Sequence, residues 1–250
     1  MPARIQSAHH GPSGAARLVQ DRAIGRRHPA LGAHNGLPFA LRCGGHSFEG
    51  FSQSANVVID TRKIDDVTLD AGSQTVTVGA GASLGTVYKA LKGRGFAFAA
   101  GSCPTVGVAR HALGGGFGLL GRAYGLICDN LVSLNIVDAE GGILTIDAQQ
   151  HPDLFWACRG GGGGSFGIAT KFRFRVQALP RVAVFGVTWA LATARAVRLF
   201  DAWQRWAPTA PNAITSIMKV GRRSDGGAAL HRPGSEAALR RQPRRCGRRR

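Results

Sequence analysis

The sequence has no long hydrophobic run and few acidic side chains. Its 250 residues contain 32 Lys and Arg against 14 Asp and Glu. No stretch approaches the roughly 18–20 apolar residues that a membrane span needs. The polar first 18 residues do not resemble a secretion signal. We therefore expect a cytoplasmic protein without a membrane partner.

Signatures of metal and nucleotide binding are also missing. The five cysteines are widely spaced, with neither a CxxC pair nor an HExxH motif, which argues against a resident metal. There is no GxxxxGK[ST] phosphate loop. Two strings fit GxGxxG, at 116–121 and 162–167. Neither lies between a strand and a long helix, so a Rossmann dinucleotide site is excluded.

The positive charge is concentrated at the two ends. Residues 1–41 carry a formal charge of +4, residues 221–250 carry +8, and the 179 residues between them carry +6. The seven arginines of 240–250 would bind phosphate with a strong salt dependence. No aromatic residue lies among them to stack on bases. A nucleic-acid partner is therefore the less favoured interpretation.

Between the ends, the pattern predicts an α+β fold. Ser83 can cap a helix whose apolar residues Leu84, Val87 and Leu91 recur at helical spacing. Apolar or alternating segments predict strands at 37–41, 56–60, 75–78, 131–139, 143–147 and 168–179.

The pattern of apolar and β-branched residues changes after Pro180. Strands are expected at 182–189 and 214–220, on either side of a helix over 191–206. Residues 221–250 have no β-branched or aromatic residue and are predicted to be disordered. The expected divisions are an atypical segment at 1–34, a domain at 35–180, the start of a second domain at 181–220, and an Arg-rich tail.

Glycine is abundant, with 36 residues, and it gathers in loops that could carry chemistry. In Arg42–Ser47, consecutive glycines can expose backbone N–H groups that hold an anion. The alternative is a tight turn with a bystander histidine. The second loop, Gly101–Gly118, contains Cys103, which is either a reactive thiol or an inert buried one. The third spans Arg159–Gly167.

Taken with Asp129-Asn130 and the segment His151–Trp156, these loops resemble in order and spacing the FAD-linked oxidases like berberine bridge enzyme. The resemblance covers 36–180 and, more loosely, 181–220. It implies an α+β fold, with a two-subdomain FAD-binding domain of the PCMH or vanillyl-alcohol-oxidase type. The start of a truncated α+β substrate domain would follow.

The resemblance also implies a site. His46 would bond covalently to the flavin 8α-methyl group of FAD, and Cys103 to flavin C6 as in bicovalent members. A hydride would pass from a sugar or alcohol substrate to the flavin, with O₂ as acceptor. The other implied cofactor-binding residues are Arg42, Gly44, Gly45, Ser47, Gly101, Thr105, Val106, Gly107, His111, Gly114, Gly115, Gly118, Asn130, Gly167 and Ile168.

Three departures from the family pattern bear on activity. Arg110 and Cys43 stand where the family usually has small residues, and Arg110 could either pair with phosphate or obstruct it. The family's catalytic base, a tyrosine or glutamate near the C-terminus, has no counterpart. The Arg-rich ends suggest out-of-frame readings of a GC-rich gene, or else a natural basic tail. An inactive FAD-binding remnant is therefore the alternative to an active oxidase.

Overall fold

The computed structural model describes residues 38–179, 181–184, 186–187 and 193–218. The chain divides into two compact units, the first ending at Leu179 and the second starting at Pro180. The predictions for 1–34 and 221–250 lie outside the described residues.

A five-stranded antiparallel sheet forms the centre of the first unit. Along it lie β3 (Val67–Asp70), β4 (Thr75–Gly79), β8 (Ile168–Arg175), β6 (Leu131–Val137) and β7 (Ile143–Asp147), in that order. The predicted alternation in β8 is confirmed, because Phe172 and Phe174 are buried while Arg173 is exposed. The β6–β7 hairpin is confirmed as well. The sequence did not predict β3, whose half-exposed VTLD segment is short and carries two polar residues.

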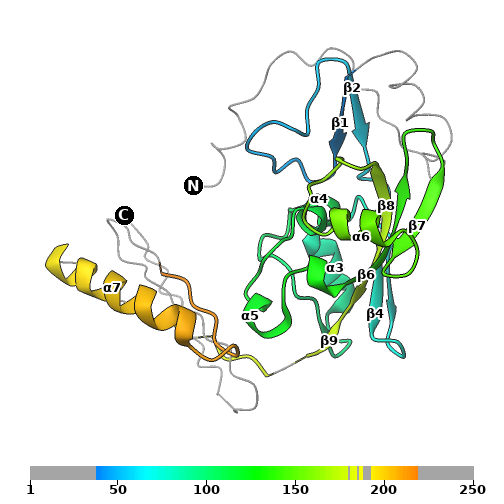
Figure 1. The fold of residues 1–250 in the computed structure, drawn as a ribbon. Coiled ribbons are helices and arrows are strands. Elements are labelled where there is room, and N and C mark those ends of the chain that lie inside the picture. Colours follow the sequence, from blue (N-terminus) through cyan, green and yellow to red (C-terminus); the bar gives the residue numbers. More distant parts are fainter. Residues whose placement is uncertain (1–37, 180, 185, 188–192, 219–250) are drawn as a thin grey trace, which may run out of the picture. The chain divides into compact units, whose positions relative to one another are not determined.

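Helices cover one face of this sheet (Figure 1). Ser83 caps α3 (Leu84–Leu91) as expected, its Oγ accepting a hydrogen bond from the Thr86 N–H at 3.1 Å. The apolar side of α3 is buried against the sheet residues, which removes that surface from water. The other helices are α4 (Val108–Leu113), α5 (Gly121–Tyr124), the 3₁₀ turn η2 (Cys128–Asn130) and α6 (Pro152–Cys158).

A smaller parallel pair, β1 (Phe39–Arg42) and β2 (Val57–Asp60), stands beside the sheet. Ile59 of β2 packs with Val137 and Ile168, which belong to β6 and β8. This second apolar cluster fixes the β1–β2 pair against the end of the large sheet. A short antiparallel pair, β5 (Phe96–Ala97) and β9 (Gln177–Ala178), completes the unit.

The second unit contains α7 (Thr193–Thr209), close to the predicted helix. Its Trp203 indole N–H donates to Ser216 Oγ at 3.0 Å. The strands expected at 182–189 and 214–220 are wrong for the residues described there, which adopt no strand. β-Branched residues favour a strand only where a neighbour supplies hydrogen bonds, and the described strands do not pair with these segments. Within the described ranges, no helix is both long and apolar enough to span a bilayer.

Candidate cofactor-binding site

A cavity of about 390 Å³ opens in the first unit, within the range of roughly 300–1,000 Å³ usual for small-molecule sites. Three segments form its walls: the loop after β1, the stretch from Cys103 through α4, and the glycine run that leads into β8. The lining residues are Leu41, Arg42, Cys43, Gly44, Gly45, His46, Phe48, Ser52, Thr61, Cys103, Val106, Gly107, Ala109, Arg110, His111, Leu113, Gly163, Gly164, Ile168 and Ala169.

Two of these walls touch backbone to backbone. A Cβ added at Gly44 would overlap the backbone nitrogen of Gly107, and one added at Gly107 would overlap Cys43 Sγ. Only glycine allows this approach at both positions. The predicted glycine motifs therefore join two chain segments that are more than 50 residues apart.

The first turn of α3 holds the Cys103–Gly107 loop in place. The Leu84 N–H donates to the Val106 carbonyl at 2.9 Å, and the Gly85 N–H donates to the Pro104 carbonyl at 2.8 Å. The opening N–H groups of a helix lack partners within the helix, so here they bind a loop. The loop is thus anchored to the core while the side chains of Cys103 and Thr105 remain exposed.

His46 and Cys103 meet at one hydroxyl. The imidazole Nε2 of His46 lies 2.9 Å from Thr105 Oγ1, and Cys103 Sγ lies 3.4 Å from the same oxygen. Hydrogen bonds from the Thr105 side chain, and then from backbone groups, hold the pKa of the Cys103 thiol below its usual value. We call His46, Cys103 and Thr105 the Thr105 side of the cavity.

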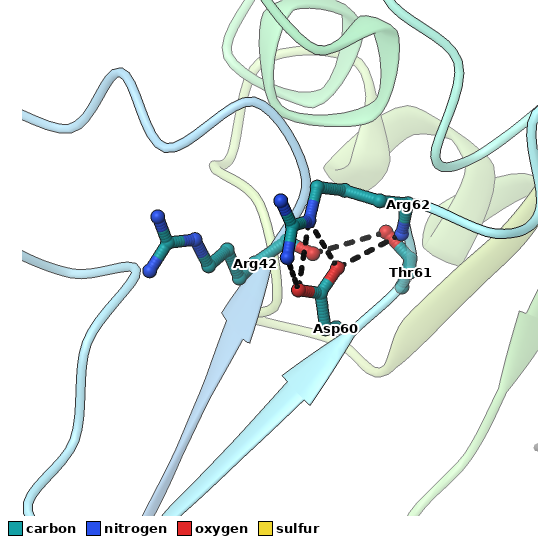
Figure 2. A network of polar contacts seen from close by, with 4 residues as sticks. All are labelled: Arg42, Asp60, Thr61 and Arg62. Carbon is teal, nitrogen blue, oxygen red and sulfur yellow. Dashed lines mark hydrogen bonds and ion pairs between the residues drawn. The ribbon is translucent and has the colours of Figure 1, made fainter. Parts of the chain in front are cut away.

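A polar network lies at the ends of β1 and β2 (Figure 2). The buried Asp60 carboxylate accepts hydrogen bonds from the Arg62 backbone N–H at 3.0 Å and from Arg62 Nε at 2.8 Å. Burial alone would raise the pKa of Asp60, but these hydrogen bonds outweigh it and lower the pKa. The Thr61 N–H and hydroxyl both donate to the Arg42 carbonyl, at 2.9 and 3.2 Å.

Arg42 belongs to this network through its backbone, and its side chain points away from Asp60 (Figure 2). The buried Nε of Arg42 has no hydrogen-bond acceptor in the structure. The guanidinium lies along Gly45, where the backbone has a φ of +70°. Arg42 therefore offers an unused, buried donor on the cavity wall.

Cys43, beside Arg42, has an unreactive environment. Burial raises the pKa of its thiol to about 11, and the nearby Asp60 charge acts in the same direction. We call the lining residues Arg42, Cys43 and Thr61, together with the adjacent Asp60 and Arg62, which do not line the cavity, the Asp60 side of the cavity.

His111, on α4, serves the architecture of the cavity. Its Nε2 accepts a hydrogen bond from the Gly101 N–H at 2.9 Å, and burial lowers the pKa of the imidazole. Both observations favour the neutral form with its proton on Nδ1. His111 thus lines the cavity and also fixes the start of the Gly101 loop.

The structure brings nine of the seventeen predicted cofactor-binding residues to the cavity wall. Asn130 is not among them: its amide donates to the Tyr124 and Leu126 carbonyls, each at 2.9 Å, and braces that loop from within. Ser47 accepts a hydrogen bond from the Phe51 N–H and shapes its own turn. The others that do not line the cavity are Gly101, Thr105, Gly114, Gly115, Gly118 and Gly167.

Sequence reasoning missed the Asp60–Arg62 pair, because no motif marks a carboxylate at the end of a strand. Gly163 and Gly164 lie in a run that was noted without a role, and both line the cavity. Arg110 lines it as well, with its guanidinium carbon 5.4 Å from the centre of the Phe51 ring. Its cation lies over an aromatic face, a favourable arrangement.

Comparisons with known proteins agree with this architecture. A family model described as an FAD binding domain matches residues 30–147. The chain is 40% identical over 190 residues to YgaK of Bacillus subtilis (strain 168), described as an uncharacterized FAD-linked oxidoreductase. It is 45% identical over 176 residues to berberine bridge enzyme-like D-2 of Nicotiana tabacum. These matches cover 74% and 67% of the chain, but only 42% and 31% of the two relatives.

Solved structures give the same result. The Bermuda grass isoallergen BG60 superposes with a TM-score of 0.78 at 33% identity, covering 88% of this chain and 46% of the allergen. A variant of Phl p 4 described as a glucose dehydrogenase gives a TM-score of 0.73 at 32% identity, covering 81% of this chain and 43% of that protein. The chain therefore spans less than half the length of these relatives.

Proposed function

Because the chain belongs to the berberine bridge enzyme-like family of FAD-linked oxidoreductases, we propose that its cavity binds FAD covalently and supports oxidation of a small alcohol or sugar. The observation that carries this proposal is the meeting of His46 and Cys103 at one hydroxyl on a glycine-walled cavity.

The residues present fit FAD. Among the described lining residues there are two arginines and two histidines but no aspartate or glutamate, a charge balance suited to a diphosphate. The buried Arg42 Nε has an unused hydrogen bond to give. Gly44 and Gly107, which touch each other, place two residues without side chains on the cavity wall, where backbone groups can approach an anion.

The chemistry supplied by a bound FAD would be acceptance of a hydride from a substrate C–H bond, with an acceptor such as O₂ taking up the electrons. His46 would hold the cofactor through its imidazole, and Cys103 would supply a second attachment as the thiolate, which is the nucleophilic form of cysteine. Arg42 and Arg110 would neutralise anionic oxygens. The apolar residues Leu113 and Ile168 would exclude water from the wall.

The test of this proposal is the intact mass of the full chain after denaturation. We expect a mass increment of one FAD that persists in denaturant and disappears when His46→Ala and Cys103→Ala are combined. The matched control is His151→Asn, because His151 is exposed, lies outside the cavity and has a left-handed backbone that asparagine tolerates. A bare polypeptide mass for the soluble wild type, or retention of the increment in the double variant, would refute covalent attachment through these two residues.

A second candidate function is flavin binding without turnover. The described cavity lining contains no carboxylate and no tyrosine that could take a substrate hydroxyl proton, and the His111 Nε2 is already occupied by the Gly101 N–H. Bleaching of the flavin absorbance by sugars or simple alcohols under anaerobic conditions would support the oxidoreductase. A flavin that is retained but never bleached, though dithionite reduces it, would support the second candidate.

A further inference from the structure

We propose that the Thr105 hydroxyl is a positioning group that passes the Cys103 thiol proton to the His46 imidazole. The proposal deepens the proposed function, because it rests on Cys103 being needed as a thiolate there. The proton transfer itself can be measured without any flavin.

The geometry requires one oxygen to serve two partners. Thr105 Oγ1 lies 2.9 Å from His46 Nε2 and 3.4 Å from Cys103 Sγ, so the hydroxyl can accept from one neighbour while it donates to the other. His46 and Cys103 come from loops that are 57 positions apart in the chain. Among the hydrogen bonds of the described residues, those at Thr105 are the ones that link the imidazole to the thiol.

The proton transfer balances without any further reactant. Cys103 S–H gives its proton to Thr105 Oγ1, while the Thr105 O–H gives its own proton to His46 Nε2. The products are a thiolate, an unchanged threonine and an imidazolium. The new imidazolium charge lies near the thiolate and stabilises it.

The surroundings allow this arrangement. Cys103 and Thr105 are both exposed, so water reaches the pair, and the hydrogen bonds from Thr105 outweigh the small effect of burial on the thiolate. The other titratable and charged groups that line the cavity are Arg42, Cys43, Arg110 and His111. The groups that lower the pKa of Cys103 are the Thr105 hydroxyl and nearby backbone N–H groups. Burial raises the pKa of Cys43 to about 11, so this thiol supplies no negative charge that would oppose a thiolate at Cys103.

The experiment is the pH dependence of iodoacetamide alkylation at Cys103 in the full chain. Peptide mapping reports the extent of alkylation at each cysteine separately. Only peptides without attached flavin are counted. We expect Thr105→Val to slow alkylation of Cys103 near neutral pH by about three- to ten-fold, the range expected for loss of one hydrogen bond. We expect Thr105→Ser to restore the wild-type profile. The control is Ser102→Ala, which removes the neighbouring exposed hydroxyl and is expected to change nothing.

His46→Ala closes a double-mutant cycle. We expect it to slow alkylation of Cys103 by a similar factor. We expect alkylation in the Thr105→Val/His46→Ala double variant to be no slower than in either single variant. An unchanged rate in His46→Ala, additive effects in the double variant, or a Thr105→Ser variant as slow as Thr105→Val would each overturn the proposal. His46→Ala decides alone if Thr105→Val does not fold.

The two proposals fail in different ways. Coupling between Cys103 and His46 in a protein that never retains flavin would refute the covalent-flavin function and support this inference. Retained flavin with no coupling would overturn only the role of Thr105.

Discussion

The Asp60 side and the Thr105 side of the cavity each contain a cysteine, in opposite surroundings. Cys43 is enclosed beside the Asp60 carboxylate, and burial raises its pKa to about 11. Cys103 is exposed, and hydrogen bonds from Thr105 lower its pKa. The Asp60 side is held by a buried, fully bonded carboxylate, while the Thr105 side presents its polar atoms to solvent. One side therefore maintains the shape of the site and the other carries its reactivity.

The difference between the two sides is tested most strongly by measuring the alkylation rates of both thiols in one reaction. At a pH of about 8, a thiol with a pKa of about 11 is about 0.1% thiolate. A thiol at the ordinary value of 9.0 is about 9% thiolate, and the lowered pKa of Cys103 raises its fraction above that. We expect iodoacetamide to modify Cys103 at least about 100-fold faster than Cys43. Peptide mapping over a time course gives both rates. Equal rates would show that the two sides do not differ as described.

The contact between the two sides can be broken at Gly44. Gly44→Ala places a Cβ against the Gly107 backbone nitrogen, so the loops must separate. We expect a loss of about 1–3 kcal/mol in the free energy of unfolding, the usual cost of overpacking, together with loss of retained flavin. Denaturant unfolding and intact mass measure the two effects.

Gly121→Ala is the matched control for that variant, because a Cβ at Gly121 meets nothing within 4 Å. Equal stability of Gly44→Ala and the wild type would contradict the close approach of the loops.

The Asp60 side can be weakened without touching the Thr105 side. Asp60→Asn removes the charge that Arg62 binds, and we expect the free energy of unfolding to fall by about 1–2 kcal/mol at neutral pH, typical of a lost charged hydrogen bond. The control is Asp201→Asn, which breaks an exposed ion pair with Arg205 four residues on along α7. Such surface pairs contribute only about 0.3–0.5 kcal/mol.

The stability difference between the wild type and Asp60→Asn should depend on pH in the acid range. The folded pKa of Asp60 lies below its usual value of 3.8, so its contribution is complete above that pH and is lost as the pH falls through the folded pKa. Below a pH of about 4, the stability of the wild type should therefore approach that of Asp60→Asn. A gap between the two that stays constant down to the lowest pH measured would contradict the depressed pKa.

The strands and helices of the first unit were largely predictable, because local patterns specify them. The alternation of Phe172 and Phe174 with exposed charges, and the cap at Ser83, both appear as expected. Glycine motifs also located two walls of the cavity. What sequence could not show is which side chains meet: the shared Thr105 hydroxyl and the Asp60–Arg62 pair depend on how distant loops pack.

The prediction of strands after Pro180 was wrong for a related reason. Val182, Val184 and Val187 have suitable side chains, but a strand also needs a hydrogen-bonding neighbour, and sequence alone does not say whether one is present. Asn130 was assigned to the cofactor by its place in a motif. Its amide nitrogen donates to the Tyr124 and Leu126 carbonyls, and its amide oxygen accepts from Gln177 Nε2 at 3.2 Å.

The most direct test of the division between the Asp60 side and the Thr105 side is to map where the flavin is attached in the unmodified full chain. Peptide mapping with fragmentation can distinguish all eight histidines and all five cysteines. We expect flavin on His46, with any second bond at Cys103 and none at Cys43 or His111. Flavin attached at Cys43 or His111, or soluble protein with no attached flavin, would contradict the division of the cavity into a structural and a reactive side.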